Sequence, residues 1–282
     1  MKLEVFRSLW GWEGDWNTCV EQLREVGCVG IESRLPYEAS AQNALRQRLS
    51  DAQLAYIAVV FTGGDVVPKQ DWTLQQHWDR LQASIDGAQH VGARFLNVLP
   101  GNDRWPLAKQ VEFFGRAQEM ADASGALCSF EIHRATSLYS PWVALQVIEQ
   151  LPQLRFTCDL SHWVVVCERL LNDPVDDLRP FIERVHHIQA RVGYDQGPQV
   201  PHPDAPEYGD AVRFHQNVWE RIWAAQQARG YGVTTLTPEF GPDGYTHKLP
   251  FTQMPIADLW SLNSGMARTE MDHFAQWQAA HI

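Results

Sequence analysis

Residues 127–133 read LCSFEIH, residues 155–161 read RFTCDLS, and residues 234–240 read TTLTPEF. In each stretch apolar and polar side chains alternate, which is the pattern of a strand with two unlike faces. Segments with apolar residues at three- and four-residue steps, typical of amphipathic helices, lie elsewhere between such stretches. A regular succession of strand and helix predicts a parallel sheet.

The same unit recurs along the whole chain. The other strand candidates are LEVFRSL (3–9), CVGIES (28–33), LAYIAVVF (54–61), ARFLNVLP (93–100) and RVHHIQAR (184–191). Helical periodicity covers 15–26, 39–52, 72–91, 110–124 and 212–229. Eight units within about 250 residues are typical of a closed (β/α)8 barrel, and no GxGxxG or P-loop motif favours an open doubly wound sheet. We therefore predict α/β architecture with a single (β/α)8 TIM barrel domain over residues 1–282.

Two segments rich in proline and glycine follow the last two strand candidates. Residues 193–210 and 241–255 are expected to be long loops over the C-terminal mouth of the barrel, where such folds keep their active sites. A last helix near 266–280 carries an apolar stripe of Met271, Phe274 and Trp277. We expect this stripe to close the barrel, with contact to a second subunit as the alternative.

Composition narrows the class of protein. The chain has 282 residues, is 45% hydrophobic and carries a formal charge of -11, which disfavours nucleic acid as a partner. No apolar run reaches the roughly 18 residues that span a bilayer, and the first residues do not resemble a signal peptide, so we expect a cytoplasmic protein with no membrane partner. The five cysteines lie among apolar neighbours without a CxxC pair, which predicts buried thiols that form no disulfide.

Alternation along the last strands places acidic residues on one face. In a barrel the apolar face of each strand packs on helices, so the polar faces converge on the axis. Glu131, Asp159 and Glu239 all lie on these polar faces, near the C-terminal ends of their strands. Carboxylates gathered in a confined space need a cation or a shared proton, and a divalent metal is the simplest cation.

The alternative is that arginines neutralise these acids. The candidates are Arg34, Arg94, Arg134 and Arg191. If a metal is present, oxygen ligands suit Mn²⁺ or Mg²⁺, whereas histidines nearby would admit Zn²⁺ or Co²⁺. These histidines are His133, His162 and His187.

The motifs SFEIHR, CDLSHW and TPEFGP resemble those of the xylose isomerase-like TIM barrel superfamily, which includes sugar phosphate isomerase/epimerase-like proteins, dehydratases and apurinic-site endonucleases. The resemblance implies a metal held by residues from strands five to eight, here Glu131, Asp159, Gln189 and Glu239. The chain has Gln189 where the family has a ligand histidine, which favours a harder ion or a weaker site, and His187 is a backup ligand. The DxxH pair of Asp159 and His162 also resembles the family.

The resemblance implies a metal-dependent isomerase or epimerase of a small sugar or related hydroxy-carbonyl compound. Glu131 and Glu239 would be the catalytic base and acid around a metal-stabilised enediolate. His162, Arg191 and His133 would bind the substrate, a small carbohydrate-like molecule. The family also favours a homo-oligomer.

Three other functions are alternatives to the isomerase or epimerase. A dehydratase of a keto-polyol would use the same site, and a non-catalytic ligand-binding barrel is suggested by Gln189. A DNA repair nuclease needs further histidines at the early strand ends, which read FTG (61–63) and LPG (99–101), and a DxH element where the late loop reads HPD (202–204). Among the 12 tryptophans, Trp10 is the best placed to stack on a sugar ring.

Overall fold

The computed structural model describes residues 1–242 and 244–281. Its eight strands form a closed barrel in chain order, β1 to β8, and every strand pairing with a recorded register is parallel. The predicted (β/α)8 barrel is therefore confirmed, and all eight strand candidates form strands. The strands are β1 Lys2–Ser8, β2 Gly30–Arg34, β3 Ala55–Phe61, β4 Phe95–Leu99, β5 Cys128–Glu131, β6 Phe156–Cys158, β7 Val185–Ala190 and β8 Val233–Pro238.

The helices include every helix that periodicity predicts and some that it does not. They are α1 Trp16–Val26, α2 Ala39–Ala52, α3 Leu74–Val91, α4 Leu107–Ser124, α5 Pro141–Gln150, α6 Leu160–Cys167, α7 Arg179–Ile182, the 3-10 helix η1 Pro206–Tyr208, α8 Gly209–Ala228 and α9 Leu259–Ala280. The sequence LSHWVVVC of α6 has no polar face and a β-branched run, so its periodicity does not predict a helix. Helix α6 begins because the Asp159 side chain accepts a hydrogen bond from the Ser161 amide.

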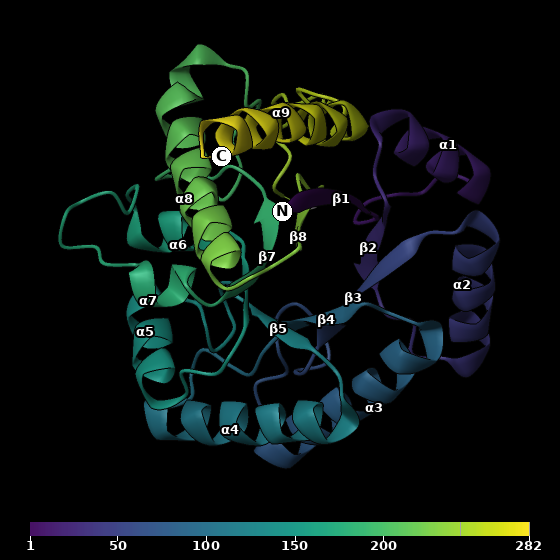
Figure 1. The fold of residues 1–282 in the computed structure, drawn as a ribbon, viewed down its shortest axis with the longest axis vertical. Coiled ribbons are helices and arrows are strands. Elements are labelled where there is room, and N and C mark those ends of the chain that lie inside the picture. The colour runs from purple at the N-terminus through teal and green to yellow at the C-terminus, as the bar shows by residue number, and fades with distance from the viewer. Residues whose placement is uncertain (243, 282) are drawn as a thin grey trace. The chain divides into compact units, whose positions relative to one another are not determined.

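The chain divides into two compact units, each described below by itself. Unit 1 comprises Met1–Val29, Asp159–Asp177 and His187–Ile282, and unit 2 comprises Gly30–Cys158 and Leu178–His186. Figure 1 labels the elements of both units except β6 and η1.

Unit 2 confirms the expected sorting of side chains on its strands. Phe130 of β5 packs on Phe114 of α4, with ring centroids 5.1 Å apart, so the apolar face of β5 points to the helices. On the opposite face, the hydroxyls of Ser129 and Thr157 lie 2.7 Å apart, and both residues are fully buried. The polar positions of neighbouring strands therefore meet on the inner face of the sheet.

Unit 1 contains the C-terminal helix. Helix α9 packs on β1 and β8, as expected for a helix that closes the barrel. Phe274 and Trp277 of its apolar stripe are buried and lie 5.0 and 5.6 Å from the ring of Trp223 in α8, whereas Met271 is only half-buried. The stripe therefore contributes to the core of unit 1.

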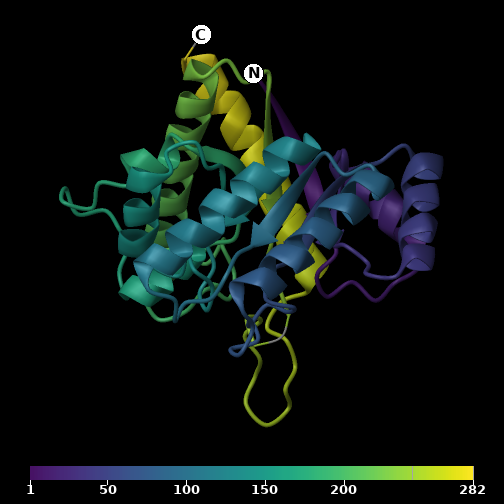
Figure 2. The same ribbon diagram turned by 90° about the horizontal axis from the view of Figure 1, so that it is seen from below.

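Both predicted loops of unit 1 are present. The segment after β7 contains η1, and Gln199 within it binds the backbone amide of Gly241, at 2.8 Å, in the segment after β8. The segment between β8 and α9 extends outward from these two elements as a long loop, seen in yellow-green in Figure 2, and is bridged between Lys248 and Pro255. Asp243 of the expected loop 241–255 lies outside the described residues.

All five cysteines, each of them within the described residues, are free, and four are buried as predicted, whereas Cys167 is half-buried. Burial raises the pKa of both Cys28 and Cys128 to about 12, which keeps these thiols protonated at neutral pH. None of the described helices has the length and apolarity to cross a bilayer.

A histidine joins α8 to α9 in unit 1. His273 of α9 faces the carboxylate of Glu270 through Nδ1 at 2.9 Å and the carboxylate of Glu220 of α8 through Nε2 at 2.8 Å. Burial alone would lower the pKa of His273, but the hydrogen bonds and charges of Glu270 and Glu220 raise it above its ordinary value. Only the protonated ring donates to both carboxylates.

Because the folded-state pKa of His273 is raised, its stabilising contribution is fully present below the unfolded-state pKa of about 6.5 and is lost as the pH rises through the folded value. We predict that His273→Gln lowers the free energy of unfolding by about 1–2 kcal/mol at pH 6 and by less at pH 9. Urea denaturation at several pH values measures this. His202→Gln, in an exposed loop, is the matched control, and an equal loss at both pH values would contradict the assignment.

Candidate active site

Asp159 occupies the junction between β6 and α6 in unit 1. It is fully buried, and its Oδ1 accepts hydrogen bonds from the backbone amide of Ser161 at 3.2 Å and from the Ser161 hydroxyl at 2.6 Å. Its Oδ2 lies 3.2 Å from Nε2 of His162, the second residue of the DxxH pair. The first turn of α6 therefore brings these two predicted site residues together, since residues three apart share a helix face.

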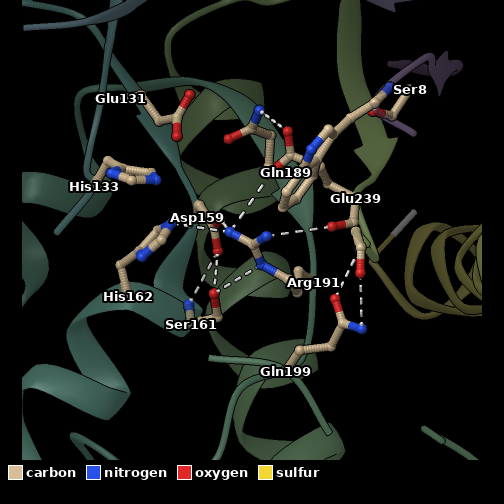
Figure 3. Close-up of polar contacts among 12 residues, drawn as sticks. Ser8, Glu131, His133, Asp159, Ser161, His162, Gln189, Arg191, Gln199 and Glu239 are labelled. Carbon is tan, nitrogen blue, oxygen red and sulfur yellow. Dashed lines mark hydrogen bonds and ion pairs between the residues drawn. The ribbon is translucent and has the colours of Figure 1, made fainter. Parts of the chain in front are cut away.

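Arg191 follows β7 and joins these residues to the end of β8. Its Nη2 donates to Oδ2 of Asp159 and to Nε2 of His162, the latter at 2.9 Å, and its Nε donates to the Ser161 hydroxyl at 3.1 Å. The same Nη2 lies 3.8 Å from Oε2 of Glu239. Figure 3 shows the guanidinium with Asp159 and Ser161 on one side and Glu239 on the other. Arginine pairing, the alternative to a metal, thus holds for Asp159.

The charge of Arg191 determines the state of Asp159. Burial alone would raise the pKa of Asp159, but the charge of Arg191 holds it well below its usual range, helped by the hydrogen bond from Ser161. Asp159 is therefore a carboxylate throughout the neutral range. Since both partners are almost completely buried, the pair is desolvated.

Glu239 and Gln189 form the second contact of this site. Nε2 of Gln189 donates to Oε1 of Glu239 at 2.9 Å, and Gln189 itself is fully buried. The Glu239 side chain retains 13% exposure, whereas that of Asp159 retains 0%. Of these two acids, Glu239 is therefore the one that a ligand can reach.

Two aromatic rings lie over Arg191. The guanidinium carbon is 4.5 Å from the ring centroid of Tyr245 and 5.6 Å from that of Trp10, and the two rings meet edge to face at 5.0 Å. Such cation–π contacts limit the movement of the guanidinium and shield its ion pair from water. Trp10 thus lies at the site, where its ring contacts a cation of the protein.

His187 lies deeper on β7 and is fully buried. Its Nδ1 is 2.8 Å from the hydroxyl of Thr235, and its Nε2 is 3.3 Å from the hydroxyl of Thr237. Both ring nitrogens are therefore engaged by β8, and the backup ligand role expected for His187 requires that one of these contacts break.

Unit 2 contributes a separate group of buried polar residues. Nδ2 of Asn97 donates to Oε1 of Glu32 at 2.9 Å and to Oε2 of Glu131 at 2.8 Å. An amide nitrogen carries two hydrogens, so Asn97 serves both carboxylates at once. His133, two residues beyond Glu131, is also buried and has its Nδ1 against the backbone oxygen of Arg134.

Several residues of these sites were not predicted from the sequence. Asn97 lies on the inner face of β4 and was open to the same analysis of alternation as the later strands. Ser161 acts because α6 begins at Asp159, and that helix start was not predicted. Tyr245 lies in an irregular loop, which has neither hydrophobic periodicity nor a sequence motif from which its position could be predicted.

Comparison with known proteins places the chain in a family. A family model described as xylose isomerase-like TIM barrel matches residues 20–199, which is more than half of the chain. The chain belongs to the xylose isomerase-like TIM barrel family. The resemblance seen in its motifs is thereby confirmed. A comparison with curated proteins found no match.

Solved structures resemble this xylose isomerase-like barrel over its whole length. A structure of L-ribulose 3-epimerase has a TM-score of 0.65 at 14% identity and covers 100% of this chain and 97% of its own. D-allulose 3-epimerase from Methylomonas sp., in complex with D-allulose, has a TM-score of 0.62 at 16% identity and covers 98% and 97%. The IOLI protein with a bound zinc atom has a TM-score of 0.59 at 13% identity and covers 100% and 99%. At these identities the likeness shows the fold.

The buried pair in this xylose isomerase-like barrel has a measurable consequence. Removing one partner leaves an uncompensated buried charge, so Arg191→Met should lower the free energy of unfolding by about 3–5 kcal/mol. Combining it with Asp159→Asn removes both charges, and the double variant should lose less stability than the sum of the single variants. Urea denaturation of all four proteins gives the coupling energy.

The matched control is Arg116→Met with Glu119→Gln, an exposed pair at 3.0 Å on α4. Its coupling energy should be no more than about 0.5 kcal/mol. Additive effects at Arg191 and Asp159 would contradict a direct interaction between them.

Proposed function

We propose that the protein is a divalent-metal-dependent isomerase or epimerase of a small sugar or related hydroxy-carbonyl compound. The observation that carries this proposal is the accessible carboxylate of Glu239, held by Gln189 beside a buried Arg191–Asp159 pair. Active sites of closed parallel barrels lie at the C-terminal ends of the strands, and we propose that Glu131 at the end of β5 and Glu239 after β8 both act there.

Glu239 is proposed as one proton-transfer group and Glu131 as the other. Both are glutamates from different strands, so they can approach a substrate carbon from two directions, one as base and the other as acid. Gln189 orients Glu239 by its amide hydrogen bond, and Asn97 orients Glu131 in the same way. Amide donors fix each carboxylate without changing its charge.

Two of the predicted metal ligands already form hydrogen bonds or ion pairs within the protein. Asp159 is paired with Arg191, and Gln189 directs its amide nitrogen at Glu239, so the expected set of Glu131, Asp159, Gln189 and Glu239 needs the buried pair to open. Breaking that pair costs about 3–5 kcal/mol.

Glu131, His133 and His162 are buried residues of the types that bind divalent ions, and neither member of the Arg191–Asp159 pair is among them. Two imidazoles with one carboxylate suit Zn²⁺, Co²⁺ or Mn²⁺ better than Mg²⁺. We therefore propose these three residues as the ligands. A bound divalent ion would polarise the substrate carbonyl and make the neighbouring proton easier to remove.

Arg191 is predicted to bind the substrate, and we propose that it also positions the site. Its hydrogen bonds to Asp159, Ser161 and His162 support this second role. The substrate would contact Glu239 and the aromatic pair of Trp10 and Tyr245. The sugar epimerases among the solved structures, one of them bound to D-allulose, support a small neutral ketose as substrate.

Exchange of the substrate proton tests the roles of the two glutamates. With the metal-loaded protein in deuterated water and a panel of ketopentoses and ketohexoses, NMR should show loss of the proton next to the carbonyl. Glu239→Gln and Glu131→Gln should each slow this exchange by about 10²–10⁴-fold, because a carboxamide cannot accept the proton.

Glu119→Gln, an exposed change on α4, is the matched control and should keep the full rate. Exchange at the normal rate in Glu239→Gln would remove that residue from proton transfer. A product with the mass of the substrate supports isomerisation, whereas a product lighter by one water would instead establish the dehydratase alternative.

Elemental analysis tests the proposed ligands. We expect the purified protein to hold about one divalent ion per chain, and His162→Gln and His133→Gln to lose most of it, because each removes one of three ligands. His202→Gln, in an exposed loop, should keep the ion. Retention of metal in both ligand variants, with loss in Glu239→Gln, would favour the set that includes Glu239.

A further inference from the structure

Unit 2 has a cavity of about 690 Å³ outside the strands. It lies where α3 and α4 begin, and these two helices pack side by side (Figure 1). Three indole rings line it, those of Trp72, Trp78 and Trp105, and none of its lining residues belongs to a strand or to the polar group around Glu131. Packing of a hydrophobic core does not account for three tryptophans that line an open cavity, so another role for them is considered.

The indole ring of Trp78 has a face that is available to a ligand in this cavity. It is half-buried on α3, and its Nε1 donates to the backbone oxygen of Phe113 in α4 at 3.3 Å. Within residues 1–242 and 244–281, neither an aromatic nor a cationic group lies against its ring. The hydrogen bond fixes the plane of the indole in advance, so stacking a ligand on it costs little side-chain entropy.

The other two indoles already carry cations of the chain. Nζ of Lys109 is 4.7 Å from the ring centroid of Trp105, and Nζ of Lys69 is 4.9 Å from that of Trp72. An aromatic cage for a cationic ligand would need these faces, and the lysines would repel such a ligand. The cavity is therefore not suited to an ammonium group.

The polar groups of the cavity balance one another. Arg104 and Lys109 are matched by Asp71 and Glu112, so the lining offers donors and acceptors without a net charge to attract phosphate or carboxylate. A rigid indole with planar polar side chains around it suits a ring with one apolar C–H face and a rim of hydroxyls. Neutral sugars have that chemistry.

We propose that this cavity is an accessory binding site for a neutral saccharide, stacked on Trp78 and hydrogen-bonded by the side chains of Arg104 and Glu112. The site is separate from the strand-end residues to which catalysis is assigned. Its occupancy therefore does not depend on the proposed isomerase activity.

Fluorine NMR of the full-length protein labelled with 5-fluorotryptophan tests this site. Trp78→Phe assigns the resonance of Trp78, and the titrants are glucose, cellobiose, maltose and, as an anionic ring ligand, AMP. We expect a saturable shift of the Trp78 resonance with at least one neutral saccharide and none with AMP. Trp142 on α5, which is 41% exposed, is the matched control, and its resonance should not move.

Trp78→Ala should weaken saccharide binding by about tenfold or more, while proton exchange on the ketose panel keeps its rate. If Trp78→Ala does not fold, Glu112→Ala at the rim should also weaken binding. The absence of a saturable Trp78 shift with all three saccharides would overturn the proposal. A saturable shift with AMP alone would overturn it in favour of a nucleotide, and an equal shift of Trp142 would show non-specific contact.

Discussion

A guanidinium and a carboxylate, both removed from water, organise the site of unit 1. Arg191 contacts Asp159, Ser161 and His162 at the start of α6 and lies near Glu239 after β8. An isolated buried carboxylate would be strongly disfavoured, so the position of Asp159 at the first turn of α6 depends on this cation. The first turn of α6, the end of β7 and the segment after β8 are thereby tied to one group.

The ion pair with Arg191 also gives Asp159 and Glu239 different roles. Asp159 is fully buried and fixed as an anion, which suits a residue that maintains structure. Glu239 keeps contact with solvent and has an amide partner, which leaves its carboxylate able to meet a ligand. Two acids from strands of the same barrel thus have different environments, and environment determines the chemistry that each can perform.

Much of this arrangement could be predicted from the sequence. Alternation along 127–133 and 155–161 identified the strands, and the spacing of Asp159 and His162 identified the pair at the start of α6. The pairing of Asp159 with Arg191 could only be posed as an alternative to a metal, because it depends on strand register and on where α6 begins. The cavity at Trp78 was not predictable, since its three indoles come from two segments about 30 residues apart in the sequence.

The amide of Gln189 gives the barrel a property that an imidazole at this position would lack. A glutamine side chain neither gains nor loses a proton across the accessible pH range, so residue 189 remains a hydrogen-bond donor to Glu239 at every pH. An imidazole would exchange donor for acceptor character as its surroundings change. Glu239 is therefore oriented by a partner with a permanent dipole, and its geometry is insulated from any titration at residue 189.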